Sequence, residues 1–154
     1  QHALELGTSL GITTAYLSTV RSMQSIDTVE GSPAISTLAG DMFVRHNINK
    51  INLHTGFFDD ILPSLLRNRD TYDIVYIDGN HRYESTMRYV KQILPYSTSH
   101  SLIVLDDIHW SPEMQKAWDE IIQSKDFTLT IDIFKMGFLF LNPDLQKQHF
   151  ILKY

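Results

Sequence analysis

Apolar runs of strand length alternate with helix-length segments along most of this 154-residue chain. We predict strands at residues 2–6, 25–30, 50–54, 72–78 and 101–106, and helices at residues 12–22, 32–46, 59–68, 83–94 and 112–124. Such an alternation is typical of βαβ units, whose strands lie parallel in one sheet with helices on both faces. Pro33 suits a helix start, because a proline in the first turn loses no hydrogen bond.

The C-terminal part departs from this alternation. Residues 127–134 and 136–141 are two β-rich runs joined by a tight turn near Lys135 and Gly137, and residues 149–154 are a candidate for one more strand. The pattern predicts a Rossmann-like, doubly wound α/β fold in which three layers are stacked in the order α, β, α. Its mostly parallel, seven-stranded sheet would end in an antiparallel hairpin. We expect residues 1–154 to form a single domain.

Composition and charge narrow the range of partners. The chain carries 13 Lys and Arg against 18 Asp and Glu, a formal net charge of −5, which disfavours a nucleic-acid backbone as the main partner. No apolar run approaches the roughly 18 residues that a membrane-spanning helix needs. Cysteine is absent, so disulfides and thiolate metal sites are excluded. We expect a cytoplasmic protein, and a homo-oligomer stays open.

The chain begins abruptly. Gln1 and His2 lead directly into an apolar strand and the turn at Gly7, without an initiator methionine. We therefore expect this sequence to be a trimmed part of a longer natural protein whose N-terminal segment is missing.

Polar, acidic and glycine residues gather directly after the predicted strands. In open parallel sheets, ligands bind beyond the carboxyl ends of the strands, so these positions form the expected site. The stretches concerned are residues 5–11, 30–31, 55–57, 78–81 and 106–110.

The first of these loops indicates a nucleoside ligand. Gly7 and Gly11 let the backbone approach a ligand, and the following helix begins with free N–H donors. Glu30 ends the next strand, 19 positions beyond Gly11, close to the spacing at which an acid reaches the hydroxyls of a ribose.

The same loop argues against a dinucleotide. Ser9 stands where the dinucleotide fingerprint has its second glycine, which disfavours a pyrophosphate. The carboxylate of Glu5 suits a cationic ligand better than an anionic one. A nicotinamide-dependent oxidoreductase is therefore the weaker alternative.

Residues 5–11 resemble motif I of the class I S-adenosylmethionine-dependent methyltransferases, and Glu30 resembles their ribose-binding acid. Residues 73–81, together with Tyr83, resemble the fourth-strand motif of the small-molecule O-methyltransferase branch, which includes catechol- and sugar-modifying enzymes. Residues 106–107 resemble the acidic pair of that branch. The likeness extends over nearly the whole chain, but the helices that usually precede motif I are missing.

The resemblance implies a methyl transfer from S-adenosylmethionine to an oxygen of a small molecule. It places Gly7 and Gly11 beside the methionine part of the cofactor, Glu30 at the ribose, and Gly56 and Phe57 beside the adenine. The cofactor-binding residues that it implies are Glu5, Gly7, Thr8, Ser9, Gly11, Glu30, Gly31, Gly56, Phe57 and Asp78.

The resemblance also implies a metal. In metal-dependent members, acids that match Asp78, Asp106 and Asp107 bind Mg²⁺ or a similar divalent cation. Independently, three carboxylates at adjacent strand ends are the oxygen ligands that such an ion prefers. A bound ion could hold two acceptor oxygens and lower the pKa of the one to be methylated.

Two histidines compete for the role of general base. His81 follows Asp78 by three residues, where related sugar O-methyltransferases have a catalytic histidine, so we expect it to be the base. His109 is expected to be a solvent-facing loop residue. Tyr83 and Trp110 could line an acceptor pocket or belong to the core.

Two questions stay open at this stage. The acceptor is not specified, because phenols, sugars and amino sugars suit the same loops. A non-catalytic domain that binds S-adenosylmethionine, or a scaffold with this fold, is the alternative from outside the enzymes.

Overall fold

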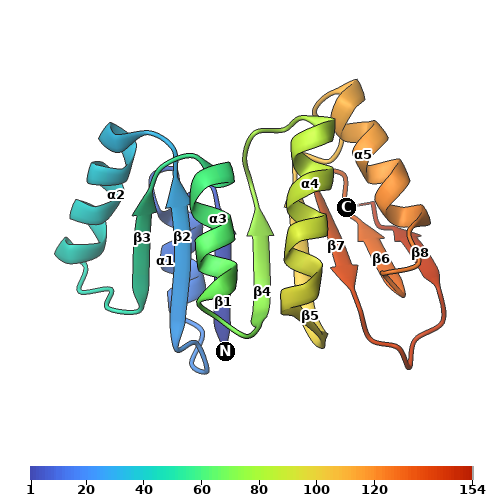
Figure 1. The fold of residues 1–154 in the computed structure, drawn as a ribbon, viewed down its shortest axis with the longest axis horizontal. Coiled ribbons are helices and arrows are strands. Elements are labelled where there is room, and N and C mark those ends of the chain that lie inside the picture. Colours follow the sequence, from blue (N-terminus) through green and yellow to red (C-terminus); the bar gives the residue numbers. More distant parts are fainter. Residues whose placement is uncertain (154) are drawn as a thin grey trace. The chain divides into compact units, whose positions relative to one another are not determined.

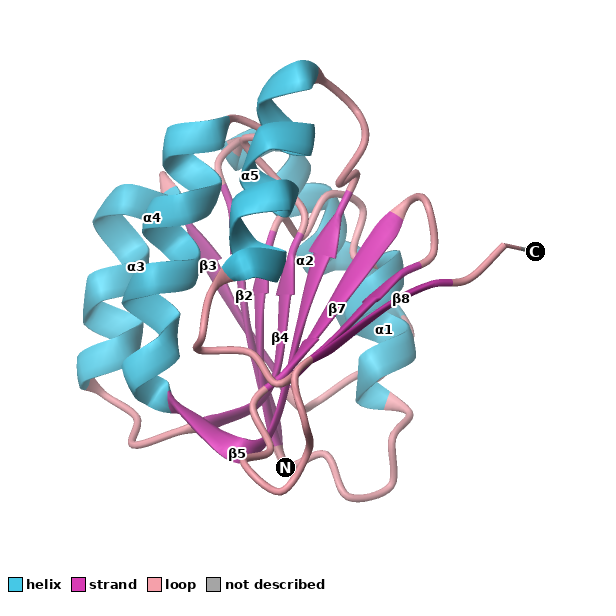
Figure 2. Cartoon of the chain, turned by 90° about the vertical axis from the view of Figure 1, so that its right-hand side faces the viewer, coloured by secondary structure: helices cyan, strands magenta, loops and turns pink. Residues whose placement is uncertain are grey.

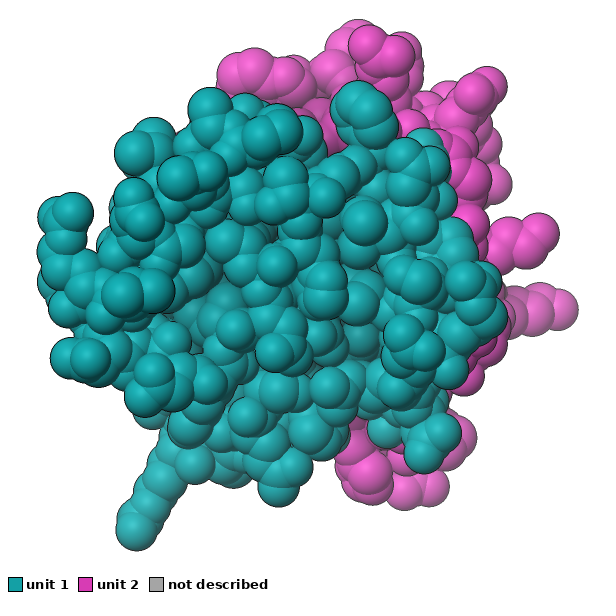
Figure 3. Space-filling model, turned by 60° about the vertical axis from the view of Figure 1, so that its left-hand side comes forward, with its two compact units in different colours: residues 1–74 teal, residues 75–154 magenta. Residues whose placement is uncertain are grey.

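The computed structural model describes residues 1–153. The strands are hydrogen-bonded in the order β3-β2-β1-β4-β5-β7-β6-β8. The chain divides into two compact units, residues 1–74 and the part from residue 75 onward (Figure 3). Each unit is described by itself, and the single domain expected from the sequence stays a prediction.

The first unit contains three parallel strands and three helices. Its elements are β1 (His2–Leu6), α1 (Ile12–Ser18), β2 (Ser25–Glu30), α2 (Pro33–Arg45), β3 (Ile51–Thr55), α3 (Phe58–Arg67) and the first half of β4 (Tyr72–Ile77). In the parallel register, Leu4 of β1 pairs with Asp27 of β2, and Asp27 pairs with Asn52 of β3. Helix α3 lies on one face of these strands and α1 on the other (Figures 1 and 2), as a doubly wound fold requires.

Helix α1 is shorter than the sequence predicts, because it ends at Ser18 and not at residue 22. The hydroxyls of Ser18 and Thr19 donate to the carbonyls of Ala15 and Tyr16, at 2.6 and 2.7 Å. Such side-chain bonds compete with the helical ladder, so two successive hydroxyl residues favour an end here.

A buried carboxylate links the strands of this unit. Asp27 is 6% exposed and accepts hydrogen bonds from Asn52 at 2.9 Å and Tyr72 at 3.1 Å. The guanidinium of Arg69 lies 3.3 Å away and the ring of His54 lies 3.4 Å away. Burial would raise the pKa of Asp27, but these partners outweigh it and lower the pKa to about 2.

The second unit contains the antiparallel part of the sheet. Its elements are the second half of β4, α4 (Tyr83–Ile93), the short 3₁₀ helix Leu94–Tyr96, β5 (Ser97–Asp106), α5 (Pro112–Gln123), β6 (Leu129–Asp132), β7 (Met136–Phe140) and β8 (Gln148–Ile151). Strand β7 runs antiparallel to β5 and β6, and β8 runs parallel to β6. Helices α4 and α5 lie on one face of these strands (Figure 2).

The α/β class and the antiparallel C-terminal hairpin are confirmed. The candidate strand at residues 149–154 forms as β8 (Gln148–Ile151), which makes the sheet eight-stranded, and Tyr154 lies outside the described residues. The tight turn between β6 and β7 lies at Lys135 as predicted, with Phe134 in the left-handed conformation (φ 72°) and Gly137 as the second residue of β7. Gly137 has no room for a side chain, because a Cβ there would lie 2.4 Å from the Trp118 ring. Among the described residues, no helix has the length and apolar character to cross a membrane.

Candidate active site

Three loops of the first unit meet at the carboxyl end of β2. The carbonyl oxygen of Val29 accepts the N–H groups of Gly7 and Thr8, at 3.0 and 3.2 Å. The carbonyl oxygen of Glu30 accepts the N–H of Gly56 at 2.9 Å. The loops that follow β1 and β3 are therefore both hydrogen-bonded to the end of β2, where the sequence predicts the nucleoside site.

The side chain of Glu30 joins the glycine loop directly. Its Oε2 accepts the backbone N–H of Ser9 at 2.9 Å, and its Oε1 accepts the N–H of Ser32 at 2.9 Å. Ser9 adopts a left-handed conformation (φ 49°). The two features on which the nucleoside interpretation depends, the glycine loop and the acid after β2, are thus in contact.

Glu5 has a different place from the one expected of a ligand-facing acid, because it is completely buried. Its Oε2 accepts the hydroxyls of Thr14 and Thr28, and the hydroxyl of Thr8 bonds to that of Thr28 at 2.6 Å. Glu5 therefore supports the loop from below, through threonines that lie on β2 and α1.

The glycines around this site serve different purposes. Gly11 precedes α1 with φ 79°, and a Cβ there would lie 2.6 Å from the ring of Phe43. Its small size is required by packing against α2, a reason that does not involve a ligand. Gly31, in contrast, is exposed, and a Cβ there would meet nothing within 4 Å. Phe57 is 73% exposed beside Gly56.

The second unit brings the predicted acids and His81 together at the ends of β4 and β5. The Nε2 atom of His81 lies 3.5 Å from Oδ1 of Asp78, and the Tyr76 hydroxyl donates to Oδ2 of Asp78 at 3.5 Å. Asp106 is the last residue of β5 and Asp107 follows it, with a left-handed backbone at φ 51°.

Charge and burial shift two pKa values in this cluster. The hydrogen bond to Asp78 raises the pKa of His81, and the charges of Asp78, Asp107 and Asp106 add to it against the effect of burial. Burial, followed by the charge of Asp78, raises the pKa of Asp106. The cluster is thus one set of interacting acidic and basic groups.

The structure gives no support of its own for a metal at this cluster. Within residues 1–153, no group of three or more histidine or acidic side chains is arranged so that it could hold an ion. The carboxylates of Asp78, Asp106 and Asp107 lie at neighbouring strand ends, and a divalent cation held by them stays a prediction.

The sequence itself provides the decisive comparison. Residues 4–108, more than half of the chain, match a family model described as a methyltransferase domain. The chain belongs to this methyltransferase family. A comparison with curated proteins finds no match.

Solved structures share the fold of this methyltransferase domain. A protein provisionally assigned as an O-methyltransferase from Klebsiella pneumoniae has a TM-score of 0.79 at 17% identity, with 92% of this chain and 73% of that one covered. The O-methyltransferase TomG from Streptomyces achromogenes, in complex with S-adenosylmethionine, has a TM-score of 0.77 at 18% identity, with 91% and 72% covered. An O-methyltransferase from Bacillus cereus, in complex with S-adenosylhomocysteine, has a TM-score of 0.74 at 19% identity, with 90% and 73% covered.

In this methyltransferase domain, His109 is not the solvent-facing residue expected from the sequence. Its Nε2 lies 2.8 Å from Oδ2 of Asp132, which also accepts the indole N–H of Trp118 at 3.1 Å, and its Nδ1 contacts Gln115. Burial lowers the pKa of His109, but the bonds to Gln115 and Asp132 outweigh it and raise the pKa. With both ring nitrogens engaged, His109 anchors the loop after β5.

The two aromatic candidates for the acceptor pocket of the methyltransferase domain, Tyr83 and Trp110, have different surroundings. Trp110, three residues after Asp107, is 74% exposed, so its side chain is accessible to an acceptor. Tyr83 lies against α5, where its hydroxyl donates to Glu120. The local sequence offers no signal for the roles of Asp132 and Glu120, because their partners are 23 and 37 residues away.

Proposed function

We propose that this methyltransferase domain transfers a methyl group from S-adenosylmethionine to an oxygen of a small-molecule acceptor. The observation that carries the proposal is the contact between the glycine loop and Glu30, where Ser9 donates to the carboxylate at 2.9 Å. A carboxylate at this position can accept both hydroxyls of a ribose, because each of its oxygens has a lone pair beyond the one already used.

The preference for a sulfonium cofactor over a dinucleotide rests on the same loop. Ser9 occupies the place of the second fingerprint glycine, and beneath the loop the hydroxyl of Thr14 donates to the buried Glu5. A serine in place of that glycine leaves less room for the backbone to approach a pyrophosphate. Two proteins of the same fold were solved with S-adenosylmethionine or S-adenosylhomocysteine, which supports this choice.

The bound cofactor would supply an electrophilic methyl group, which moves to the acceptor oxygen as the bond between carbon and sulfur breaks. The chain would contribute position and proton removal. His81, held against Asp78, accepts the proton of the acceptor hydroxyl, and the negative charge of Asp78 stabilises the resulting imidazolium. The exposed ring of Trp110, which follows the acids at the end of β5 in the sequence, is available as an apolar face for the acceptor.

A divalent cation at Asp78, Asp106 and Asp107 is proposed on the family resemblance and on carboxylate chemistry alone. Because these residues do not form a three-ligand group, no step of the mechanism above depends on an ion. The net charge of −5 supports a small molecule as acceptor over a nucleic acid.

Turnover separates this proposal from a non-catalytic domain that only binds the cofactor. The assay follows transfer of a labelled methyl group from S-adenosylmethionine to a panel of catechols, phenols and monosaccharides, with His81→Ala as the inactive control. We expect the wild-type protein to give labelled product with at least one acceptor class, and the His81→Ala variant to give none. Cofactor binding without product from any of them would favour the non-catalytic alternative.

A further inference from the structure

The loop that carries the proposed base has an unfavourable backbone. Asn80 and His81 are consecutive residues with left-handed conformations, at φ 65° and 32°. Residues other than glycine adopt this region at a cost in free energy, so it persists only where the surroundings hold it. What holds residues 78–82 therefore determines where the His81 imidazole lies.

One anchor lies before His81. The side-chain amide of Asn80 donates to the hydroxyl of Tyr89 at 3.1 Å. Tyr89 belongs to α4 and is 1% exposed, so it provides a rigid attachment point within the packed part of the unit.

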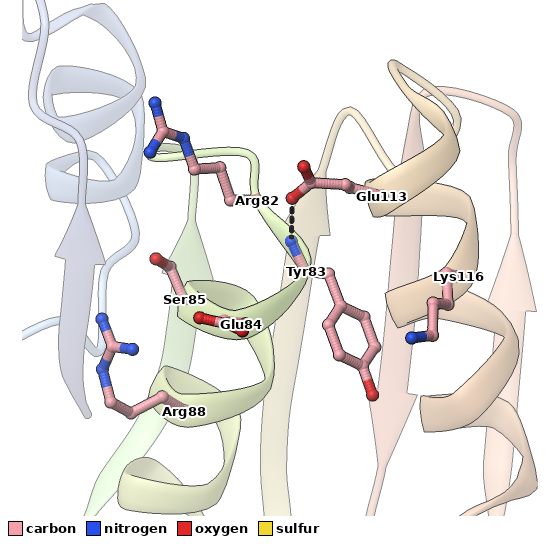
Figure 4. Close-up of a pocket in the computed structure, with 7 residues that line it drawn as sticks. All are labelled: Arg82, Tyr83, Glu84, Ser85, Arg88, Glu113 and Lys116. Atoms are coloured by element: carbon pink, nitrogen blue, oxygen red, sulfur yellow. Dashed lines mark hydrogen bonds between the residues drawn. The ribbon is translucent and has the colours of Figure 1, made fainter.

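The second anchor lies after His81 and comes from another helix. Tyr83 is the first residue of α4, and its backbone N–H donates to Oε2 of Glu113 on α5 at 3.0 Å (Figure 4). The residue before it, Arg82, makes no capping bond with its own side chain. A carboxylate from α5 thus takes the place of the missing cap, where negative charge also suits the helix dipole.

The side chain of Tyr83 strengthens the link between these helices. Its hydroxyl donates to Glu120 at 2.5 Å, and the ammonium group of Lys116 lies 4.0 Å from the centre of its ring. Figure 4 shows the ring directed toward α5, whereas Arg82 and Arg88 point away from it. Glu113, Lys116 and Glu120 lie on one face of α5, at the spacing of helical turns.

We propose that Glu113 is a positioning residue for the methyl transfer, which acts through the N–H of Tyr83 to keep His81 beside Asp78. This inference rests on the proposed function, because it takes His81 as the base. Glu113 is on the outer surface of α5, in a groove of about 510 Å³ that Arg82 and Glu84 also line. It does not belong to the acid cluster.

The test compares Glu113→Ala and Glu113→Gln with Glu84→Ala as the matched control. Glutamine retains an oxygen that can accept the Tyr83 N–H, whereas Glu84→Ala removes the same charge from the same groove. We expect Glu113→Ala to lower kcat about tenfold, since small displacements of a reacting group have effects of this size or larger. Affinity for S-adenosylmethionine and the KM of the acceptor should change less than about twofold.

Both Glu113→Gln, which retains the accepting oxygen, and Glu84→Ala should keep nearly the wild-type kcat. A role confined to stability would lower the melting temperature of Glu113→Ala but leave its kcat unchanged, and that result would overturn the inference. Amide hydrogen exchange of residues 80–83 gives a readout without turnover, and we expect it to rise about tenfold in Glu113→Ala only. Unchanged exchange would equally count against the inference.

The same experiment distinguishes a failure of the proposed function. If His81→Ala retains full turnover, the base assignment is wrong whatever Glu113 does. If His81→Ala is inactive and Glu113→Ala behaves as wild type in both kcat and exchange, only the positioning role is rejected.

Discussion

The backbone N–H of Ser9 donates to Oε2 of Glu30 across 2.9 Å, although 21 residues separate them in the sequence. The other oxygen of Glu30 accepts the N–H of Ser32. Glu30 is therefore held in one orientation at the rim of the glycine loop before any ligand binds. A carboxylate that is already oriented binds hydroxyls without an ordering cost, which is the physical basis for the proposed ribose site.

Substitution of Gly11 tests the packing reason for its small side chain. Gly11→Ala places a Cβ 2.6 Å from the Phe43 ring on a backbone with φ 79°, and we expect a loss of about 2 kcal/mol or more in the free energy of unfolding. Gly31→Ala is the matched control, because a Cβ there meets no atom within 4 Å and should leave stability within about 0.5 kcal/mol. Urea denaturation measures both. Equal stability of the two variants would show that Gly11 does not pack as described.

The pH dependence of turnover tests His81 as the base. His81 must be neutral to accept a proton, and its pKa is raised above the ordinary value of 6.5, first by Asp78. We therefore expect kcat/KM to fall as the pH decreases through a pKa above 6.5. Asp78→Asn removes the largest cause and leaves burial, which lowers the pKa, so the acid limb of the profile should move to lower pH. An acid limb at the same pH in the wild type and in Asp78→Asn would show that the interaction of His81 with Asp78 does not cause it.

Asp27 predicts a second pH effect, on stability. Its pKa is lowered from 3.8 to about 2 in the folded protein, so its contribution is complete above pH 3.8 and is lost as the pH falls toward 2. This pKa shift corresponds to a contribution of about 2 kcal/mol to the free energy of unfolding. Urea denaturation between pH 5 and pH 2, compared with the same series for Asp27→Asn, measures it. Parallel curves for the two proteins would contradict the assignment.

A divalent cation can be tested through Asp106 and Asp107. If these residues hold an ion, added Mg²⁺ should increase turnover, a chelator should remove the increase, and Asp106→Ala with Asp107→Ala should abolish it. Affinity for S-adenosylmethionine should stay within a few fold, because Glu30 is untouched. Full turnover in the presence of the chelator would reject the cation, and His81 would then remove the proton without its help.

Much of the arrangement was predictable from the sequence because it depends on local periodicity. The alternation of apolar and polar segments predicts the parallel strands, and residues after parallel strands must gather at one edge of the sheet. For this reason the loop at Ser9 and the acid Glu30 could be placed together before the structure was known.

The sequence could not provide the partners that individual side chains find across the fold. The sequence suggests that Glu5 faces a ligand, but in the structure it is buried and bonded to Thr28, 23 residues away. His109 reads as a loop residue until Asp132 is placed beside it. The end of α1 at Ser18 and the left-handed Phe134 depend on competing local hydrogen bonds and turn geometry, which a periodicity of apolar residues does not record.

Calorimetric titration with S-adenosylmethionine and NAD, in parallel on the wild-type protein, Glu30→Ala and the charge-matched control Asp41→Ala, tests the central claim most directly. We predict that S-adenosylmethionine binds to the wild type and to Asp41→Ala, and that Glu30→Ala weakens it by about tenfold to a hundredfold through lost hydrogen bonds to a charged group. NAD should not bind. Binding of NAD without S-adenosylmethionine, or unchanged affinity in Glu30→Ala, would contradict the account.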